Sequence, residues 1–286
     1  MKYELDDSFS YYAKTKYFFG KNVIITGATG GIGSLLLTTL IKLGAKVFAL
    51  VKDTNDFYKM LKKQNISSNL VEKMDFQFDS EYREVFSNIM KKLGGKLDIL
   101  FICHGSFENG DLIGTDFKEF DTLMNINTRS VLALMSLASP FLKYTQGNIV
   151  VISSLESFIP VKGSFLNTVT KSMVNSIIKN SALELASFNV RVNGVAPGVT
   201  NTHFRYNRIN GINDEFKEQM NQQFMERNGM NNLLSKKVIE PKDVVHTMLF
   251  LASSDAQFIT GEIIQIDNGY SLNHDLCFSE DVTPGI

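Results

Sequence analysis

Short apolar runs alternate with amphipathic stretches along most of the chain. The first run, Asn22–Thr26, is rich in β-branched residues, which predicts a buried strand. Apolar residues then recur at helical spacing from Ile32 to Leu43, and Gly44 predicts the end of that helix. The chain therefore begins as a strand followed by a helix, and the same alternation continues after it.

The remaining predicted elements repeat this rhythm. Further strands are predicted at Lys46–Val51, around Phe76 and Phe78 with an end at Asp79, and at Leu97–Cys103, Gly147–Ser153, Val190–Val195 and Glu262–Ile266. Further helices are predicted at 85–93, at 116–143 with an end disturbed by Pro140, and at 164–188 and 241–252. Strands that alternate with crossover helices form a parallel sheet with helices on both faces. The sequence predicts an α/β fold, a doubly wound parallel sheet of about seven strands in a single domain.

Some segments fall outside this alternation. Residues 1–19 form an aromatic, mixed-charge N-terminal extension that packs either onto the body or onto a partner. Residues 20–272 form the predicted domain, and residues 273–286 form a C-terminal tail. Within the domain, residues 199–240 are polar, with interspersed Met and Phe. These apolar residues either line a substrate pocket or form the buried side of two lid helices.

Composition narrows the class of protein. Of the 286 residues 44% are hydrophobic, enough for a substantial core, and the net charge of -1 argues against a nucleic-acid surface. No apolar run approaches the ~18 residues of a membrane span, and the acidic N-terminus does not resemble a targeting peptide. Two cysteines and four histidines predict neither a disulfide framework nor a metal cluster. We expect a reducing, cytoplasmic compartment.

A glycine-rich loop, TGATGGIG at Thr26–Gly33, joins the first predicted strand to the first helix. Glycines permit positive φ angles and let backbone N–H groups approach a phosphate. The helix N-terminus adds partial positive charge, which stabilises a bound pyrophosphate. A tight turn without a ligand is the alternative, but the position between a strand and an amphipathic helix favours dinucleotide binding.

This loop and the motifs that follow it resemble those of the short-chain dehydrogenase/reductase (SDR) family, from about Gly20 to Leu272. The similarity is greatest to the classical, 3-oxoacyl-reductase-like branch. The motifs are TGATGGIG, NINT at 125–128, ISS at 152–154, PGVTNT at 197–202, and FITG and DNG after residue 257. The resemblance implies cofactor contacts from Thr26, Gly27, Gly31, Ile32, Gly33, Asp79, Lys171, Pro197, Gly198 and Thr202. It implies catalytic roles for Asn127, Ser154 and Lys171.

The sequence differs from the family pattern at the residue that serves as the catalytic acid/base. A Tyr normally lies four residues before the Lys, where the ammonium lowers the pKa of the phenol from about 10. Here that position is Asn167, and no Tyr occurs between Tyr144 and Tyr206. A carboxamide does not titrate near neutral pH, and loss of a positioned acid/base costs ~10²–10⁴ in rate. In that case Ser154 is a turn hydroxyl and Lys171 holds only the cofactor ribose; alternatively, Lys171 supplies a proton slowly through water.

Two further positions depart from the family. The family's N-N-A-G after the fourth strand is here Ile102–Gly105, with Cys103 expected to be a small core residue and His104 a packed or capping histidine. At the end of the second strand, the acidic residue that selects NAD falls at Val51 and is followed by Lys52. A basic residue there favours NADP(H) over NAD(H), unless Asp53 turns inward to meet the ribose.

The sequence therefore predicts a dinucleotide-binding SDR-like protein whose catalysis is impaired and whose role is structural, regulatory or in assembly. The alternative is an active NADP(H)-dependent carbonyl reductase or alcohol dehydrogenase that uses Lys171, water and Ser154. The family forms dimers and tetramers through the helices that match 116–143 and 164–188. We therefore expect a homo-oligomer or a subunit of a larger assembly.

Overall fold

The structure, a computed structural model, describes residues 6–63, 70–78, 80–202, 204 and 237–272, and eight further positions between 215 and 234. Seven parallel strands form one sheet in the order β3-β2-β1-β4-β5-β6-β7. The strands are β1 Asn22–Thr26, β2 Lys46–Val51, β3 Val71–Lys73, β4 Ile99–Ile102, β5 Asn148–Ile152, β6 Arg191–Pro197 and β7 Ile263–Ile266. This is the doubly wound α/β architecture that the sequence predicts.

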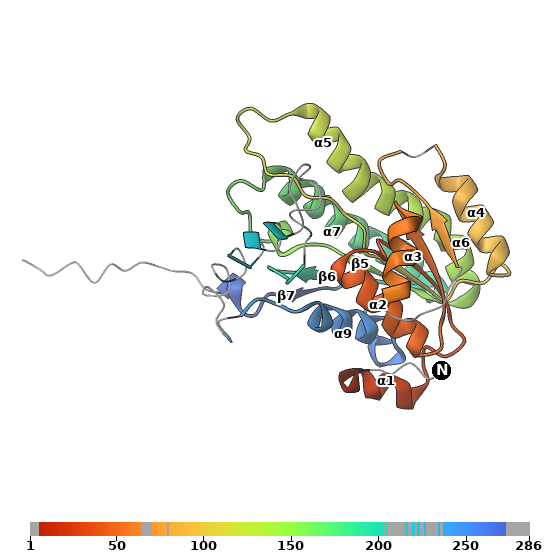
Figure 1. Ribbon diagram of the computed structural model, residues 1–286. Helices are drawn as coiled ribbons and strands as arrows, with labels where there is room; N and C mark the ends of the chain where they lie inside the picture. Colours follow the sequence, from red (N-terminus) through yellow and green to blue (C-terminus); the bar gives the residue numbers. More distant parts are fainter. Residues whose placement is uncertain are drawn as a thin grey trace, which may run out of the picture.

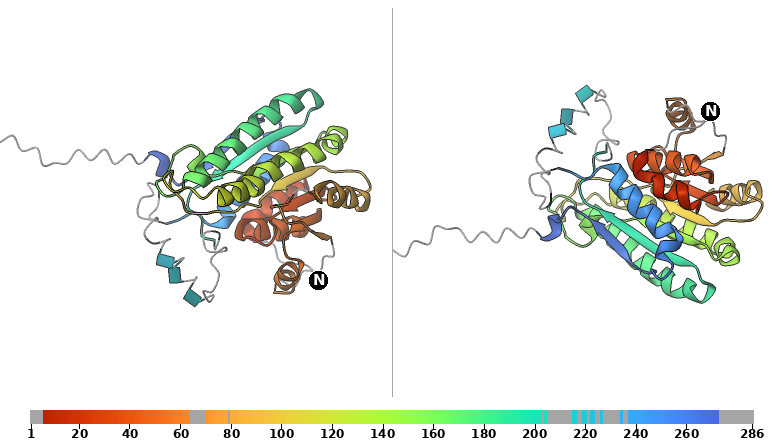
Figure 2. Two further views of the ribbon diagram at one scale, coloured as in Figure 1. Left: turned by 90° about the horizontal axis from the view of Figure 1, so that it is seen from above. Right: turned by 90° about the horizontal axis from the view of Figure 1, so that it is seen from below.

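Helices cover both faces of the sheet (Figure 1; Figure 2). One face carries α2 Gly31–Lys42, α3 Thr54–Lys63 and α9 Pro241–Ala252; the other carries α4 Tyr82–Lys92, α5 Phe117–Met124, α6 Ser130–Thr145 and α7 Phe165–Leu185. The central strands β1 and β4 are buried between two helix layers, so their residues are largely apolar instead of alternating. This burial explains why the strands appear in the sequence as short, continuous β-branched runs.

The third strand was predicted at the wrong place. Its position is Val71–Lys73, and Phe76 and Phe78 follow it in a turn. Phe76 is buried because its ring stacks on His104 with the centroids 3.7 Å apart, while Phe78 is 60% exposed. The apolar signal at Phe76 therefore came from a side-chain contact at the sheet edge and not from a strand. The predicted end of this strand, Asp79, lies outside the described residues.

Two helix predictions also need correction. The single helix predicted over 116–143 is α5 and α6 joined by a π-helical turn, Asn125–Arg129. Pro140 does not end α6, which continues to Thr145 because its apolar face stays buried against the sheet. Helix α3 was not predicted, although Phe57, Met60 and Leu61 recur at helical spacing, and Phe57 and Leu61 are its buried residues.

The N-terminal extension packs onto the body. Helix α1, Ser10–Thr15, lies beside α9 (Figure 1). The ring of Phe9 stacks on His246 with centroids 4.2 Å apart, and the Tyr12 hydroxyl donates to the His246 carbonyl at 3.4 Å. Phe9 and Tyr12 of this segment therefore contact α9.

The strand order locates the site. Successive strands β1, β2 and β3 step one way across the sheet, and β4 then pairs with β1 on its other side. A crevice forms outside the carboxyl ends of the strands where the order reverses. The loops after β1, β4, β5 and β6 meet at this edge, so residues far apart in the sequence come together there.

Candidate active site

The glycine loop closes tightly at the carboxyl end of β1. Gly27 has φ +65°, a conformation that L side chains rarely adopt, and an added Cβ would lie 2.7 Å from the His104 backbone nitrogen. At Gly33 an added Cβ would overlap the Gly27 carbonyl oxygen. The buried Thr26 lies beneath the loop, where its Oγ1 accepts the Cys103 N–H at 3.0 Å. Steric closeness at these positions explains why the loop requires glycine.

The first turn of α2 has the geometry of an anion site. Backbone N–H groups at a helix N-terminus have no intrahelical acceptor and are available to a phosphate. Gly31 approaches Thr202 so closely that an added Cβ would lie 2.5 Å from its Cγ2. The predicted cofactor residues Gly31, Ile32, Gly33, Pro197, Gly198 and Thr202 all line one cavity. The residues present therefore fit a dinucleotide pyrophosphate.

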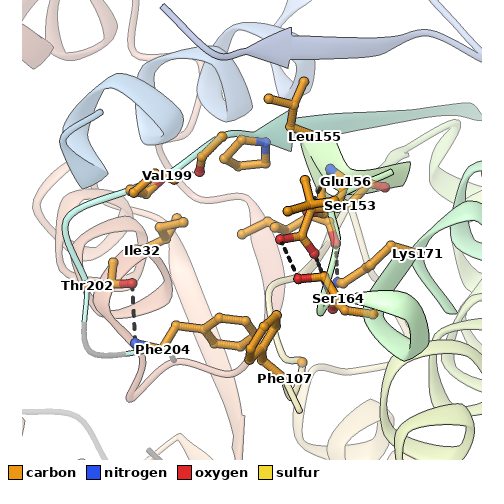
Figure 3. Close-up of a pocket in the computed structure, with 18 of the residues that line it drawn as sticks. Ile32, Phe107, Ser153, Leu155, Glu156, Ser164, Lys171, Val199, Thr202 and Phe204 are labelled. Atoms are coloured by element: carbon orange, nitrogen blue, oxygen red, sulfur yellow. Dashed lines mark hydrogen bonds between the residues drawn. The ribbon is translucent and has the colours of Figure 1, made fainter. Parts of the chain in front are cut away.

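This cavity of about 410 Å³ extends from the glycine loop to a polar cluster at β5 and α7 (Figure 3). Ser154, Asn167 and Lys171 line its polar end. Apolar side chains line much of the remainder: Phe107, Leu155, Ile159, Val161, Val199 and Phe204. A nucleotide and an apolar substrate could therefore meet next to Lys171.

Asn127 lies in the π-helical turn and is completely buried. Its Oδ1 accepts the Ser106 N–H at 2.7 Å, and its Nδ2 donates to the Ser106 carbonyl at 2.9 Å and to Thr170 Oγ1 at 3.2 Å. These contacts hold the segment after β4 against α7. An added Cβ at Gly105, within that segment, would lie 3.4 Å from Asn127 Oδ1 and 3.5 Å from Lys171 Nζ. Asn127 is thus fixed close to the ammonium.

Ser154 follows β5 and caps a short 3-10 turn, Leu155–Ser157. Its Oγ accepts the N–H of Glu156 at 3.2 Å, so its own proton is available to a ligand in the cavity. The Ser154 hydroxyl therefore caps a turn and also lines the cavity. Both properties follow from its position at the carboxyl end of a central strand.

Asn167 lies on α7 one turn before Lys171 and is 3% exposed. Its Nδ2 donates to Glu156 Oε2, and the Glu156 carboxylate also accepts the Ser164 hydroxyl, at 3.3 Å through Oε1. Figure 3 shows Glu156, Ser164 and Lys171 together at this end of the cavity. The amide therefore positions a carboxylate.

Lys171 is 5% exposed, and its Nζ donates to the Ile152 carbonyl at 3.0 Å. Burial lowers its pKa from 10.5 to about 8, while Cys103 and the Glu156 carboxylate act in the opposite direction. The ammonium is therefore a stronger acid than that of an exposed lysine and titrates near pH 8. It can exchange a proton with a ligand or water in the cavity.

His104 and Cys103 have structural contacts. Thr26 Oγ1 already accepts two backbone N–H groups, so its hydroxyl donates to His104 Nδ1 at 2.7 Å. The other ring nitrogen, Nε2, lies 2.6 Å from Ser130 Oγ. Burial, and then the charge of Lys171, lowers the pKa of His104 to about 3, so the ring is neutral. Burial raises the pKa of the Cys103 thiol, which disfavours a nucleophilic thiolate.

The predicted nucleotide-selecting residues lie outside the cavity lining. Lys52 follows β2, its side chain is 72% exposed, and its Nζ lies 3.3 Å from Asp75 Oδ2. Asp53 does not turn inward: its Oδ1 accepts the N–H groups of Asn55 at 2.7 Å and Asp56 at 3.3 Å. Asp79 lies outside the described residues.

Sequence reasoning did not find Glu156, Ser164 or Phe107. Glu156 carried a usable signal, because it lies two residues after Ser154 at the end of a central strand. Phe107 follows β4 and reaches Phe204, with ring centroids 6.4 Å apart. Only the folded chain brings these residues together. Among the described residues, one tyrosine lines the cavity, Tyr270, and its hydroxyl makes no hydrogen bond with Lys171 or Ser154.

The described part of the chain contains no helix with the length and apolarity required to cross a membrane. No group of three His, Cys, Asp or Glu side chains in the same part is placed to hold a metal ion.

Comparison with known proteins agrees with this geometry. The family model described as "Enoyl-(Acyl carrier protein) reductase" matches residues 27–271. Short-chain dehydrogenase reductase 3a of Arabidopsis thaliana is 30% identical over 262 residues, which cover 88% of this chain and 96% of the relative. The 7alpha-hydroxysteroid dehydrogenase of Clostridium sardiniense is 28% identical over 263 residues, which cover 88% and 94%.

A solved structure titled "ElxO with NADP Bound" is also similar, with a TM-score of 0.77 at 25% identity, covering 89% of this chain and 100% of the other. The matched family region begins at Gly27 and includes the whole candidate site apart from Thr26. With the seven-stranded parallel sheet and the glycine loop at its switch point, these matches show that the chain belongs to the NAD(P)-binding short-chain dehydrogenase/reductase family.

Proposed function

We propose that this chain binds NADP(H) and that proton transfer to a carbonyl group is impaired in its site. Thr26, Gly27, Gly31, Ile32 and Gly33 would hold the pyrophosphate end, and Pro197, Gly198, Thr202 and Lys171 the nicotinamide end. Bound NADPH supplies a hydride to the substrate. The exposed Lys52 would meet a 2′-phosphate, which favours NADP(H) over NAD(H). We place the chain near the classical, 3-oxoacyl-reductase-like branch.

One observation carries the impairment: Asn167 occupies the position one helical turn before Lys171, where the resemblance places a tyrosine. Reduction of a ketone requires a proton for the developing alkoxide, and a positioned acid contributes ~10²–10⁴ in rate. The Asn167 amide already donates to Glu156 and does not titrate near neutral pH. Asn127 and Ser154 would still orient a substrate, and Lys171 would bind the ribose.

The variant Asn167→Tyr tests this proposal against Asn167→Phe, which has similar bulk without the hydroxyl. NADPH binding is measured by fluorescence titration, and NADPH oxidation is followed with a panel of apolar ketones. We expect all three proteins to bind NADPH, and only Asn167→Tyr to gain turnover, by about 10²-fold or more. Wild-type turnover that neither substitution changes would contradict the impairment, and an absence of NADPH binding would contradict the cofactor assignment.

An active NADP(H)-dependent carbonyl reductase or alcohol dehydrogenase is the second candidate. Two observations favour it: the Lys171 pKa of about 8 allows slow proton exchange through water, and relatives carry names of dehydrogenases and reductases. This candidate predicts measurable ketone reduction by the wild type. Its rate should follow the titration of Lys171 near pH 8, without a phenol-like group.

A chain with slow turnover could serve as a structural, assembly or regulatory subunit, and its surface supports association with a second copy. Large apolar side chains are exposed on α5, α6 and α7, including Phe117 at 74%, Leu132 at 53% and Leu183 at 78%. We propose a homo-oligomer through these helices. Sedimentation analysis should show a dimer or tetramer, and Leu132→Glu with Leu183→Glu should shift it to monomer.

A further inference from the structure

At the polar end of the cavity, hydrogen-bond acceptors lie beside the donors Ser154 and Lys171. The Glu156 carboxylate borders the cavity and accepts from Asn167 and Ser164. Both Glu156 oxygens act as hydrogen-bond acceptors in these contacts. This arrangement presents negative charge beside Lys171, close to where a substrate would meet the nicotinamide.

Asn167 adds a second acceptor. Its Nδ2 donates to Glu156, and this contact fixes the amide with its oxygen turned away from the carboxylate. Within the described residues, Asn167 Oδ1 is buried and has no hydrogen-bond partner. A buried polar atom without a partner is costly, so a ligand or water that donates a hydrogen bond there is favoured.

The remaining lining is apolar and aromatic. Phe107 and Phe204 lie in the same cavity with ring centroids 6.4 Å apart. The Cζ of Phe204 would lie 3.8 Å from a Cβ added at Gly105, a point that is also 3.5 Å from Lys171 Nζ. Aromatic faces attract cations as well as apolar groups. The site therefore combines an apolar wall, a carboxylate and an unpartnered acceptor.

We propose that the substrate of this site is an apolar iminium ion, or the amine formed from it, with Glu156 as the residue that binds its positively charged nitrogen. Asn167 is the positioning residue that holds the carboxylate and offers Oδ1 to a substrate N–H. This inference deepens the proposed function and rests on its cofactor assignment. It explains why a site with a carboxamide instead of a titratable group at position 167 can retain a nucleotide cradle.

The chemistry balances without a general acid. The hydride that NADPH supplies forms a C–H bond at the iminium carbon, and the two electrons of the C=N π bond move to nitrogen. The products are NADP⁺ and a neutral amine, which takes its proton from water afterwards. A ketone differs because its oxygen must gain a proton as the C–H bond forms. An iminium ion is already positively charged, so it requires a negatively charged group beside it and no proton donor.

Lys171 is the main charge that opposes a cationic ligand. The titratable groups that raise its pKa are Cys103 and Glu156, of which the Glu156 carboxylate supplies negative charge. His104, whose pKa is lowered to about 3 by burial and by Lys171, is neutral. Burial lowers the pKa of Lys171 to about 8, so its charge decreases as pH rises through 8. Binding of a permanently charged iminium should therefore strengthen as pH rises through 8.

Ligand binding without cofactor separates this inference from the proposed function. Calorimetry compares 1,2,3,4-tetrahydroisoquinoline, a cation at neutral pH, with its neutral oxygen isostere isochroman. We expect the cation to bind at least tenfold more tightly to the wild type. Glu156→Gln should remove this preference, whereas Glu184→Gln, on an exposed position of α7, should keep it. Equal binding of the two probes, or a preference that survives Glu156→Gln, would overturn the inference.

Turnover gives a second readout. With NADPH, N-methyl-3,4-dihydroisoquinolinium should be reduced at least tenfold faster than α-tetralone by the wild type, after subtraction of the rate without protein. Glu156→Gln should lose this activity while its NADPH fluorescence titration and melting temperature stay unchanged. Bound NADPH without iminium reduction contradicts the substrate class alone; an absence of NADPH binding contradicts the proposed function. If Glu156→Gln does not fold, Asn167→Leu tests the same acceptor pair.

Discussion

The buried ammonium of Lys171 makes a quantitative prediction about stability. Its pKa in the folded protein is lowered from 10.5 to about 8 by burial. The protonated lysine is therefore disfavoured in the fold below pH 8, and this penalty disappears above pH 10.5, where the unfolded chain has also lost the proton. At ~1.36 kcal/mol for each pH unit, the full gap corresponds to about 3 kcal/mol.

The perturbation is Lys171→Met, which keeps much of the length and removes the charge. Losing the hydrogen bond to the Ile152 carbonyl costs a roughly constant amount at every pH. The free energy of unfolding of the wild type also depends on pH. Between pH 8 and 10.5 the unfolded wild type binds more protons than the folded protein. Its free energy of unfolding therefore rises with pH relative to that of the variant. The difference in free energy of unfolding should change by about 3 kcal/mol across this window.

Urea unfolding of wild type and variant at several pH values from 7 to 10.5 measures this difference. Lys179→Met, at an exposed position on the same helix, is the control for removing a lysine and should give a constant difference. A constant difference for Lys171→Met as well would refute the reasoning. It would show that Lys171 is as well solvated as an exposed lysine.

Three further predictions concern the loop, the core and the cofactor. Gly33→Ala should weaken NADPH binding at least tenfold in fluorescence titrations, because its Cβ would overlap the Gly27 carbonyl oxygen. Gly30→Ala is the control and should bind NADPH normally, because the atom nearest to a Cβ added at Gly30 would lie 3.4 Å away. His104→Phe should lower the free energy of unfolding by about 1–3 kcal/mol in urea, because two buried hydroxyls lose their partner. Lys52→Ala should raise the Kd for NADPH and leave the Kd for NADH unchanged; equal effects on both would remove Lys52 from cofactor selection.

Most of the fold could be predicted because parallel strands buried on both faces leave a strong local signal. Asn22–Thr26 and Lys46–Val51 were predicted at the bounds observed. The third strand was misplaced because Val71–Lys73 has only three residues, and the buried Phe76 beside it gave a stronger apolar signal. The division of the long helix at Asn125–Arg129 depends on hydrogen-bond geometry that apolar spacing does not record.

Site residues that belong to sequence motifs were predicted, whereas residues that reach the site through tertiary contacts were missed. The cavity brings together Ser154, Lys171 and the glycine loop as the strand order requires. Glu156 was missed because its importance depends on the amide of Asn167, eleven residues away and one helix later. The sequence showed that Asn167 replaces the expected tyrosine, but it did not show that the Asn167 amide holds the Glu156 carboxylate. Such compensating contacts depend on three-dimensional packing.

A crystal structure of the NADP⁺ complex tests the central claim most directly, through the distance from every tyrosine hydroxyl to Lys171 Nζ and Ser154 Oγ. We predict that the Asn167 amide and the Glu156 carboxylate border the nicotinamide beside Lys171, with no phenol within hydrogen-bond distance of either atom. A tyrosine hydroxyl, from Tyr270 or any other residue, in contact with both Lys171 and Ser154 would contradict the account.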